Sequence, residues 1–241
     1  PDEGNSLESL VNNIESARKL GIERIIADPV LDPVGHNITE SIVRYHEFHR
    51  RYPDIPLFFG AGNVTELMDV DTIGVNATLC GIGAETGASI LFTPEYSDKA
   101  QGSIGELKKA SEMMQLCRIR ESSPKDLGID LLFIKEKRRR PDSPLPKKVI
   151  TARASKNWRQ DPAGPIRVRI VPDKINGNGG LIVAEHEKAA IAGESAREVM
   201  DTLIELELVS RLDHAAYLGR ELEKAELALR FNRSYAQDDI F

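Results

Sequence analysis

The spacing of apolar residues in the first 140 positions predicts helices and strands in strict alternation. Residues 6–21 carry apolar side chains at helical intervals, for example at Leu10 and Ile14, which is the 3.6-residue period of an amphipathic helix. Ser6 is placed to cap the start of this helix and Gly21 to end it. The same reasoning predicts helices over residues 37–52, 71–87 and 103–120, with Asn37 and Ser103 as caps, and strands over residues 23–28, 55–60, 88–92 and 129–134.

The predicted strands are continuously apolar, which is typical of a parallel sheet covered by helices on both faces. An open doubly wound α/β sheet and a (β/α) barrel both satisfy this pattern. No GxGxxG sequence follows a strand, and polar residues gather at the carboxyl ends of the strands, where barrel enzymes place their active sites. A closed barrel needs eight strands and about 250 residues. We therefore interpret residues 1–140 as the C-terminal half of a (β/α)8 TIM-type barrel.

A change in composition separates this region from the rest of the chain. Residues 141–148 are expected to be a linker, because the sequence around them is charged and interrupted by prolines. The basic run at 137–140 has no aromatic residue interleaved, which favours a solvated linker over a nucleic-acid contact. Residues 149–241 predict a small α+β domain. Its expected elements are strands over 166–171 and 181–184, a hairpin turn over 176–180, and amphipathic helices over 193–208 and 213–229.

Composition narrows the class of protein further. The 241 residues are 41% apolar and 29% charged, as in a globular chain, and no long apolar run predicts a membrane span. The net charge of −6 argues against nucleic acid as a partner. Cys80 and Cys117 form no CxxC pair, so we expect a reduced, cytoplasmic location. The chain begins with Pro1, and we expect no signal peptide.

Asp28 and Asn63 are the strongest candidates for chemistry. Asp28 ends a predicted strand, where its carboxylate can accept two parallel hydrogen bonds from a flat ring that presents an N–H beside an amino group, as pterins and guanines do. Asn63 follows the next strand and offers a donor and an acceptor, and Gly60 and Gly62 are expected to let a ligand approach the backbone. Ordinary loop polarity is the alternative explanation. Further candidates for the rim of the site are His36, Glu95, Ser97 and Lys99.

We predict no metal site. His46 and His49 have the spacing of an exposed helix face, and His186 and His214, although flanked by acidic residues, lack the tight spacing of a metal motif. Cys80 lies on a helix rich in small residues, which indicates a packed core thiol.

Two stretches of the sequence follow the pattern of a known family, namely Ile25-Ile-Ala-Asp-Pro29 and Pro56-Leu-Phe-Phe-Gly-Ala-Gly-Asn63. They resemble the pterin-binding barrel family, which includes dihydropteroate synthase and corrinoid methyltransferases that use methyltetrahydrofolate. Residues 62–76, 91–97 and 131–140 are similar to archaeal dihydropteroate synthase-related proteins. Residues 213–229 and 235–238 resemble the C-terminal domain of unknown function in those proteins, which has a distant likeness to a corrinoid-carrying subunit of the methanopterin methyltransferase complex.

The resemblance implies a pterin site with an altered charge. Asp28 matches the aspartate that holds the pyrimidine edge of the pterin, and Asn63 lies where the methyltransferases place a pterin-contacting asparagine. The synthases carry a serine-arginine-lysine run where this chain has residues 62–65, and an arginine and a histidine where it has residues 93–97. Losing these cations weakens the expected grip on a diphosphate leaving group. Lys99 is the remaining candidate for that charge.

The implied activity is that of a transferase resembling dihydropteroate synthase, which condenses a pterin methyl diphosphate with an arylamine in folate or methanopterin biosynthesis. Methyl transfer from a tetrahydropterin is one alternative, and a non-catalytic pterin- or corrinoid-binding module is another. The expected partner is a small-molecule pterin, as substrate or ligand, with no nucleic acid and no membrane. A corrinoid cofactor and a homodimer are left open.

Overall fold

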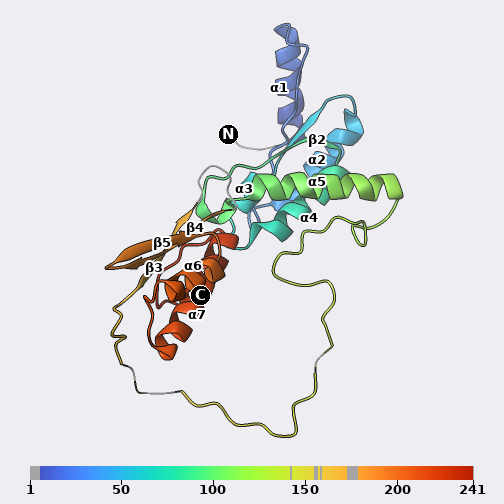
Figure 1. Cartoon of the computed structure of the whole chain (residues 1–241). Helices are drawn as coiled ribbons and strands as arrows, with labels where there is room; N and C mark the ends of the chain where they lie inside the picture. Colours follow the sequence, from blue (N-terminus) through green and yellow to red (C-terminus); the bar gives the residue numbers. More distant parts are fainter. Residues whose placement is uncertain (1–5, 142, 155–156, 158, 173–178, 241) are drawn as a thin grey trace. The chain divides into compact units, whose positions relative to one another are not determined.

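The structure, a computed structural model, describes residues 6–141, 143–154, 157, 159–172 and 179–240. The chain forms two compact units, the first made of residues 1–141 and the second of residues 142–241. Figure 1 shows that each contains helices and strands, so the chain is mixed α/β. Its sheets are small, with two strands in the first unit and three in the second, and no complete barrel is present among the described residues.

The first unit is built around parallel strands. In chain order its elements are α1 (Leu7–Lys19), α2 (Ile38–Arg51), β1 (Leu57–Gly60), α3 (Gly62–Thr65), α4 (Thr72–Glu85), β2 (Ala88–Phe92), the 3-10 turn η1 (Asp98–Ala100) and α5 (Ser103–Arg120). β1 and β2 pair in parallel, and Ala27 joins β1 through a parallel bridge to Leu57. The carboxyl ends of three parallel segments therefore lie at one edge. The predicted helices are confirmed.

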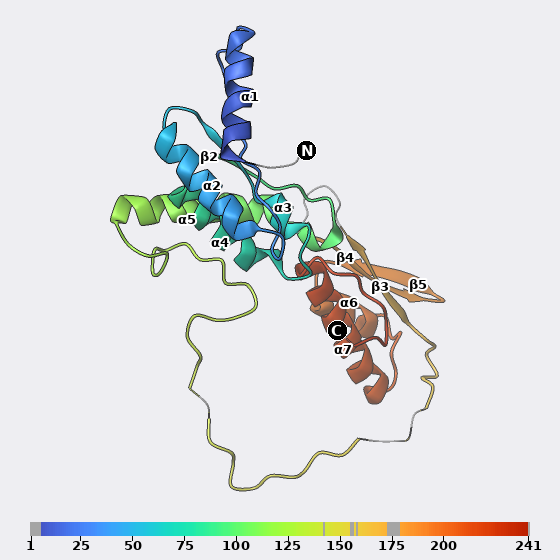
Figure 2. The same cartoon turned by 180° about the vertical axis from the view of Figure 1, so that it is seen from behind.

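Aromatic packing fixes α2 against β1. Tyr45 and Phe48 on α2 are fully buried, and the Tyr45 ring lies 5.0 Å from the Phe59 ring of β1, centroid to centroid. Figure 2 brings α2 to the front of this unit, whereas α5 lies in front in Figure 1. α4 packs on α5 and on β2, and Cys80 is buried in this core, as predicted from the small residues of α4.

Three predictions about the strands of the first unit are wrong. Residues 129–134 form no strand, because no backbone ladder reaches them among the described residues. The strand predicted over 23–28 is reduced to the bridge at Ala27. β2 is not covered on both faces, since Ile90 and Phe92 are 36% and 48% exposed.

Two predicted helix caps are also wrong, whereas a third is confirmed. Ser6 caps α1, since its hydroxyl accepts a hydrogen bond from the Ser9 N–H at 3.1 Å. Asn37 precedes α2 in a left-handed conformation and makes no side-chain cap. Ser103 is buried inside the first turn of α5, and the carboxylate of Glu95 instead accepts the Ile104 N–H at 2.9 Å. A residue distant in sequence can cap a helix, which a local pattern does not reveal.

The second unit is a three-stranded antiparallel sheet packed against two helices. Its elements are β3 (Arg167–Pro172), β4 (Gly180–His186), β5 (Ala189–Gly193), α6 (Ala196–Glu205) and α7 (Leu212–Arg230), with β4 in the centre of the sheet. Ile182 of β4, Leu203 of α6 and Leu222 of α7 are fully buried in its core. The predicted strands and helices are confirmed, although β5 was not predicted. The turn predicted over 176–180 lies largely outside the described residues.

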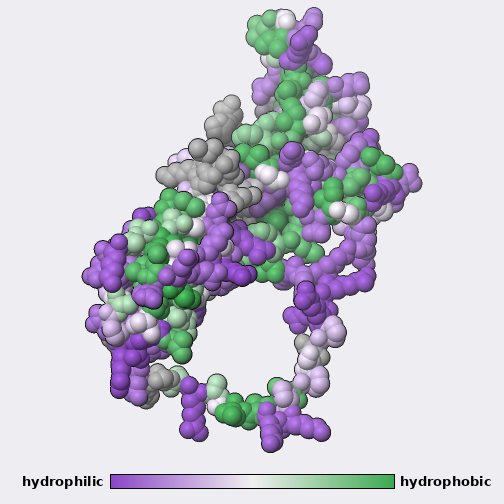
Figure 3. Space-filling view, in the orientation of Figure 1, coloured by the Kyte–Doolittle hydropathy of each residue, from purple (hydrophilic) through white to green (hydrophobic). Residues whose placement is uncertain are grey.

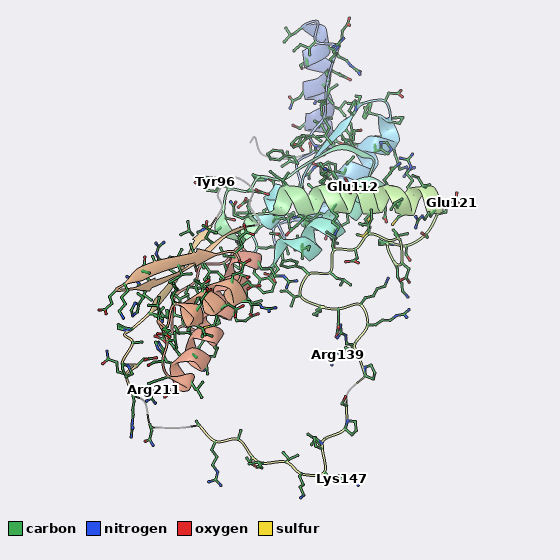
Figure 4. All side chains as sticks on the ribbon, viewed as in Figure 1. Tyr96, Glu112, Glu121, Arg139, Lys147 and Arg211 are labelled. Atoms are coloured by element: carbon green, nitrogen blue, oxygen red, sulfur yellow. The ribbon has the colours of Figure 1, made fainter. Side chains whose placement is uncertain are left out.

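The described residues between α5 and β3 contain neither helix nor strand. Figure 4 shows the side chains of Arg139 and Lys147 extending from this segment. In the space-filling view the segment carries mainly hydrophilic side chains with a few apolar ones (Figure 3). Among the described residues, no helix is both long enough and apolar enough to cross a membrane.

Candidate functional site

Asp28 lies at the tip of the first parallel segment, and its side chain is held from two sides. Its Oδ1 accepts the Val30 N–H at 2.9 Å and the Tyr45 hydroxyl at 2.9 Å. No hydrogen bond to Oδ2 is made by the described residues, and the side chain is exposed. The structure therefore presents an oriented carboxylate with one oxygen open to a ligand, rather than the two open oxygens expected from the sequence.

The loop that follows Asp28 is held by the guanidinium of Arg44. Its Nε donates to the carbonyl oxygen of Pro29 at 2.7 Å, and its Nη2 donates to that of Val30 at 2.7 Å and to Asp32 Oδ2 at 3.1 Å. Val30 has a φ of +64°, which is unusual for a β-branched residue and is tolerated only when its surroundings impose it. Backbone strain of this kind clusters at functional sites.

Asn63 contacts the same loop from the next strand end. Its Nδ2 donates to the Leu31 carbonyl oxygen at 2.9 Å, so its donor is used within the protein. Its Oδ1 makes no hydrogen bond to the described residues, and the side chain is exposed. Asp28 and Asn63 do not bond to each other, but both hold residues 28–32 and both leave an acceptor oxygen available.

The ends of β1 and β2 meet through small side chains. A Cβ added at Gly62 would overlap the ring of Pro94, and the hydroxyls of Thr65 and Thr93 lie 3.3 Å apart. Gly62 is therefore needed for packing between the two strand ends. The prediction that it admits a ligand to the backbone is wrong, because the Pro94 ring occupies that space.

The predicted rim residues form hydrogen bonds and ion pairs within the loops and make none to Asp28. Glu95 caps α5, the Ser97 N–H donates to Glu66 at 3.0 Å, and Lys99 pairs with Asp69 at 2.7 Å. The backbone of His36 closes a turn through its N–H, and its side chain is exposed. No hydrogen bond or ion pair joins any of these four residues to Asp28 or Asn63.

The charges at these strand ends favour a ligand that donates hydrogen bonds. Among the described residues, the two cationic side chains tied to these loops, Arg44 and Lys99, already pair with carboxylates. Burial and the adjacent Asp28 carboxylate raise the pKa of Tyr45, so its phenol stays protonated and acts as a donor to Asp28. The site is an acceptor edge for N–H groups, and a diphosphate would meet no unpaired cation of these loops.

The second unit contains a cluster that sequence reasoning missed. Asp161 is 5% exposed, and its carboxylate accepts five hydrogen bonds. The donors are the Ser210 hydroxyl, His214 Nδ1 and the N–H groups of Ala163, Ser210 and Arg211. Ala163 is a neighbour in sequence, but Ser210, Arg211 and His214 lie about fifty residues after Asp161, so no local spacing could have indicated the cluster.

The histidines of the second unit both contact the loop that begins at Asp161. His186 Nε2 bonds to the Ala163 carbonyl oxygen at 2.7 Å, and His186 Nδ1 accepts the Lys188 N–H at 3.2 Å. His214 Nδ1 bonds to Asp161 Oδ2 at 2.9 Å, and its Nε2 makes no hydrogen bond to a described residue. Across the described ranges, no group of three or more His, Cys, Asp and Glu side chains is arranged to hold a metal ion.

Comparison with known proteins gives two similarities. Residues 160–238 match the model of the family described as PterinBD-DUF4346. The chain is also 43% identical over 244 residues to a Methanocaldococcus jannaschii protein described as "Uncharacterized protein MJ0107", covering 98% of this chain and 46% of that protein. It thus spans about half the length of this relative, and no solved structure matches it. By sequence, the second unit is similar to a pterin-binding family, and nearly the whole chain is similar to an archaeal protein.

Proposed function

We propose that this chain forms part of a pterin-binding site, in which Asp28 and Asn63 accept hydrogen bonds from the edge of the ring. The observation that carries the proposal is the Asp28 carboxylate, which is fixed at a strand tip by Tyr45 and Val30 while one oxygen stays open. A pterin presents an N–H beside an amino group, which matches acceptor oxygens better than donors. The similarity of residues 160–238 to a pterin-binding family supports the same ligand class.

We further propose that the first unit is the C-terminal half of a (β/α)8 barrel. The apolar side chains of Ile26, Ile90 and Phe92 on its parallel segments are between 36% and 56% exposed, which is expected of a sheet face that the other strands of a closed barrel would cover. The relative is about twice as long as this chain, which leaves room for such strands. In a barrel, the tips that carry Asp28 and Asn63 would face the shared active site.

The reaction that fits this site best is group transfer at a bound pterin. Condensation of a pterin methyl diphosphate with an arylamine, as in folate or methanopterin biosynthesis, needs cations for the leaving diphosphate. Arg44 and Lys99 are both paired with carboxylates, so the geometry favours methyl transfer from a tetrahydropterin. Asp28 and Asn63 would orient the ring next to the second reactant, and this proximity would accelerate the transfer.

Replacing Asp28 by Asn is expected to weaken pterin binding at least tenfold, or roughly 1.4 kcal/mol. The amide loses the negative charge that strengthens hydrogen bonds from the ring. Titration of the chain with 6-hydroxymethyl-7,8-dihydropterin, followed by calorimetry, measures the change. Asp54→Asn is the matched control, because Asp54 is an exposed carboxylate in the turn before β1. Equal affinity of the wild type and the Asp28 variant would remove Asp28 from the site.

A corrinoid-binding role of the second unit is a second candidate, favoured by the bond between Asp161 and His214. Histidines that ligate a metal usually donate their other ring N–H to a carboxylate or a carbonyl, so His214 Nε2 fits the cobalt of such a cofactor. We expect the chain to shift the visible absorption bands of diaquacobinamide and His214→Ala to abolish the shift. His46→Ala, on the exposed face of α2, is the control. A shift that survives in the His214 variant would contradict this role.

A further inference from the structure

Tyr45 combines a buried ring with a hydroxyl at the candidate site. The side chain is fully buried, and its ring packs on Phe59. The hydroxyl lies 2.9 Å from Asp28 Oδ1 and 2.9 Å from the Phe58 carbonyl oxygen. A phenol has one proton, so this proton is shared between the Asp28 carboxylate and the Phe58 carbonyl oxygen of β1.

This sharing determines which acceptor sites Asp28 can offer. Oδ1 has two acceptor positions, and the Val30 N–H and the Tyr45 hydroxyl occupy both. A ring that presents two donors side by side needs one position on each oxygen. If the Tyr45 hydroxyl donates to the Phe58 carbonyl oxygen instead, one acceptor position on Oδ1 is released. The hydroxyl still makes a hydrogen bond, so no buried donor is left unsatisfied.

We propose that Tyr45 is a positioning residue, which orients the Asp28 carboxylate and releases one position on Oδ1 when a pterin binds. This inference rests on the proposed function. Tyr45 would not contact the ligand, because its side chain is fully buried in the core. The neighbouring Arg44 holds the backbone of residues 29 and 30, so successive residues of α2 fix both the carboxylate and the loop that carries it.

The test compares two tyrosine variants of the full chain. Tyr45→Phe keeps the buried ring and removes the hydroxyl, and it is expected to weaken binding of 6-hydroxymethyl-7,8-dihydropterin about fivefold. Tyr52→Phe is the matched control, because Tyr52 packs on Phe48 with ring centroids 5.1 Å apart in the same core. Its affinity is expected to equal that of the wild type. Circular dichroism and thermal melts verify that both variants are folded.

A double-mutant cycle separates positioning from a general structural role. If Tyr45 acts through Asp28, then Asp28→Asn combined with Tyr45→Phe binds as weakly as Asp28→Asn alone. Independent losses that multiply would overturn the inference, as would a Tyr45→Phe variant that binds like the wild type while Asp28→Asn is weakened. A wild-type chain without pterin affinity, or an Asp28→Asn variant that binds normally, would refute the proposed function itself.

Discussion

Asp161→Asn is expected to destabilise the second unit by about 3 kcal/mol, because a buried group that loses its partners is costly. The carboxylate joins the loop at 161–164 to the start of α7 through four hydrogen bonds from Ser210, Arg211 and His214. It accepts a fifth from the Ala163 N–H within the loop. An asparagine has one acceptor oxygen, and its NH₂ group would face backbone N–H donors such as those of Ala163 or Arg211. Several of these donors would then be left without an acceptor inside the protein.

The contribution of Asp161 to the stability of the second unit is expected to decrease at low pH. Burial raises the pKa of this carboxyl, but hydrogen bonds from Ser210, Ala163 and His214 outweigh burial, so the net pKa lies well below its ordinary value. A carboxyl whose pKa falls on folding stabilises the native state above its unfolded pKa of about 4, and the stabilisation is lost as the pH falls from there through the native pKa. The difference in stability between the wild type and Asp161→Asn should therefore shrink as the pH falls below about 4.

Hydrogen exchange measured by mass spectrometry resolves this loss, because it reports protection in peptides of each unit separately. We expect reduced protection over residues 161–230 and unchanged protection in α2 and α4. Asp213→Asn is the matched control, since Asp213 forms an exposed ion pair with Arg211 that contributes little stability. Equal protection in the Asp161 and Asp213 variants would contradict a structural role for the Asp161 cluster.

Gly62→Ala is expected to destabilise the first unit by about 2 to 3 kcal/mol, which is the range for overpacking a core. The added methyl group would overlap the rigid ring of Pro94, so the ends of β1 and β2 would have to separate. Asn63 and Thr65, which follow Gly62 in the same short helix, would move with it. The strain arises from contact rather than from φ, because Gly62 is not among the residues with positive φ.

The same substitution at Gly74 provides the control with the opposite sign. Gly74 lies inside α4, and a Cβ there meets nothing within 4 Å. Alanine should therefore stabilise this helix by about 0.5–1 kcal/mol. Chemical denaturation, followed by circular dichroism, compares both variants with the wild type. A Gly62→Ala chain as stable as the wild type would mean that Pro94 moves aside without cost.

Local patterns were sufficient to predict the longer helices and most strands, whereas the short helix α3 was not predicted. The periods of α1 and α7 and the apolar run of β1 are properties of neighbouring residues, so they are visible in the sequence. Residues 129–134 have the apolar character of a strand but form no strand in the described part of the chain. Strand formation depends on a partner that a local pattern does not identify.

The sequence by itself indicated that Asp28 and Asn63 lie at the carboxyl ends of parallel strands. Asp28 ends one apolar run, and Asn63 comes three residues after Gly60, which ends the next. Only the tertiary structure decided what their atoms do. Tyr45 donates a hydrogen bond to one oxygen of Asp28, and the Leu31 carbonyl oxygen accepts the amide donor of Asn63. Lys99 forms an ion pair with Asp69. The Asp161 cluster was likewise set by tertiary contacts. Hydrogen bonds between residues distant in the chain depend on how the fold brings those residues together. The periodicity of a helix, in contrast, is set by residues within a few turns of one another.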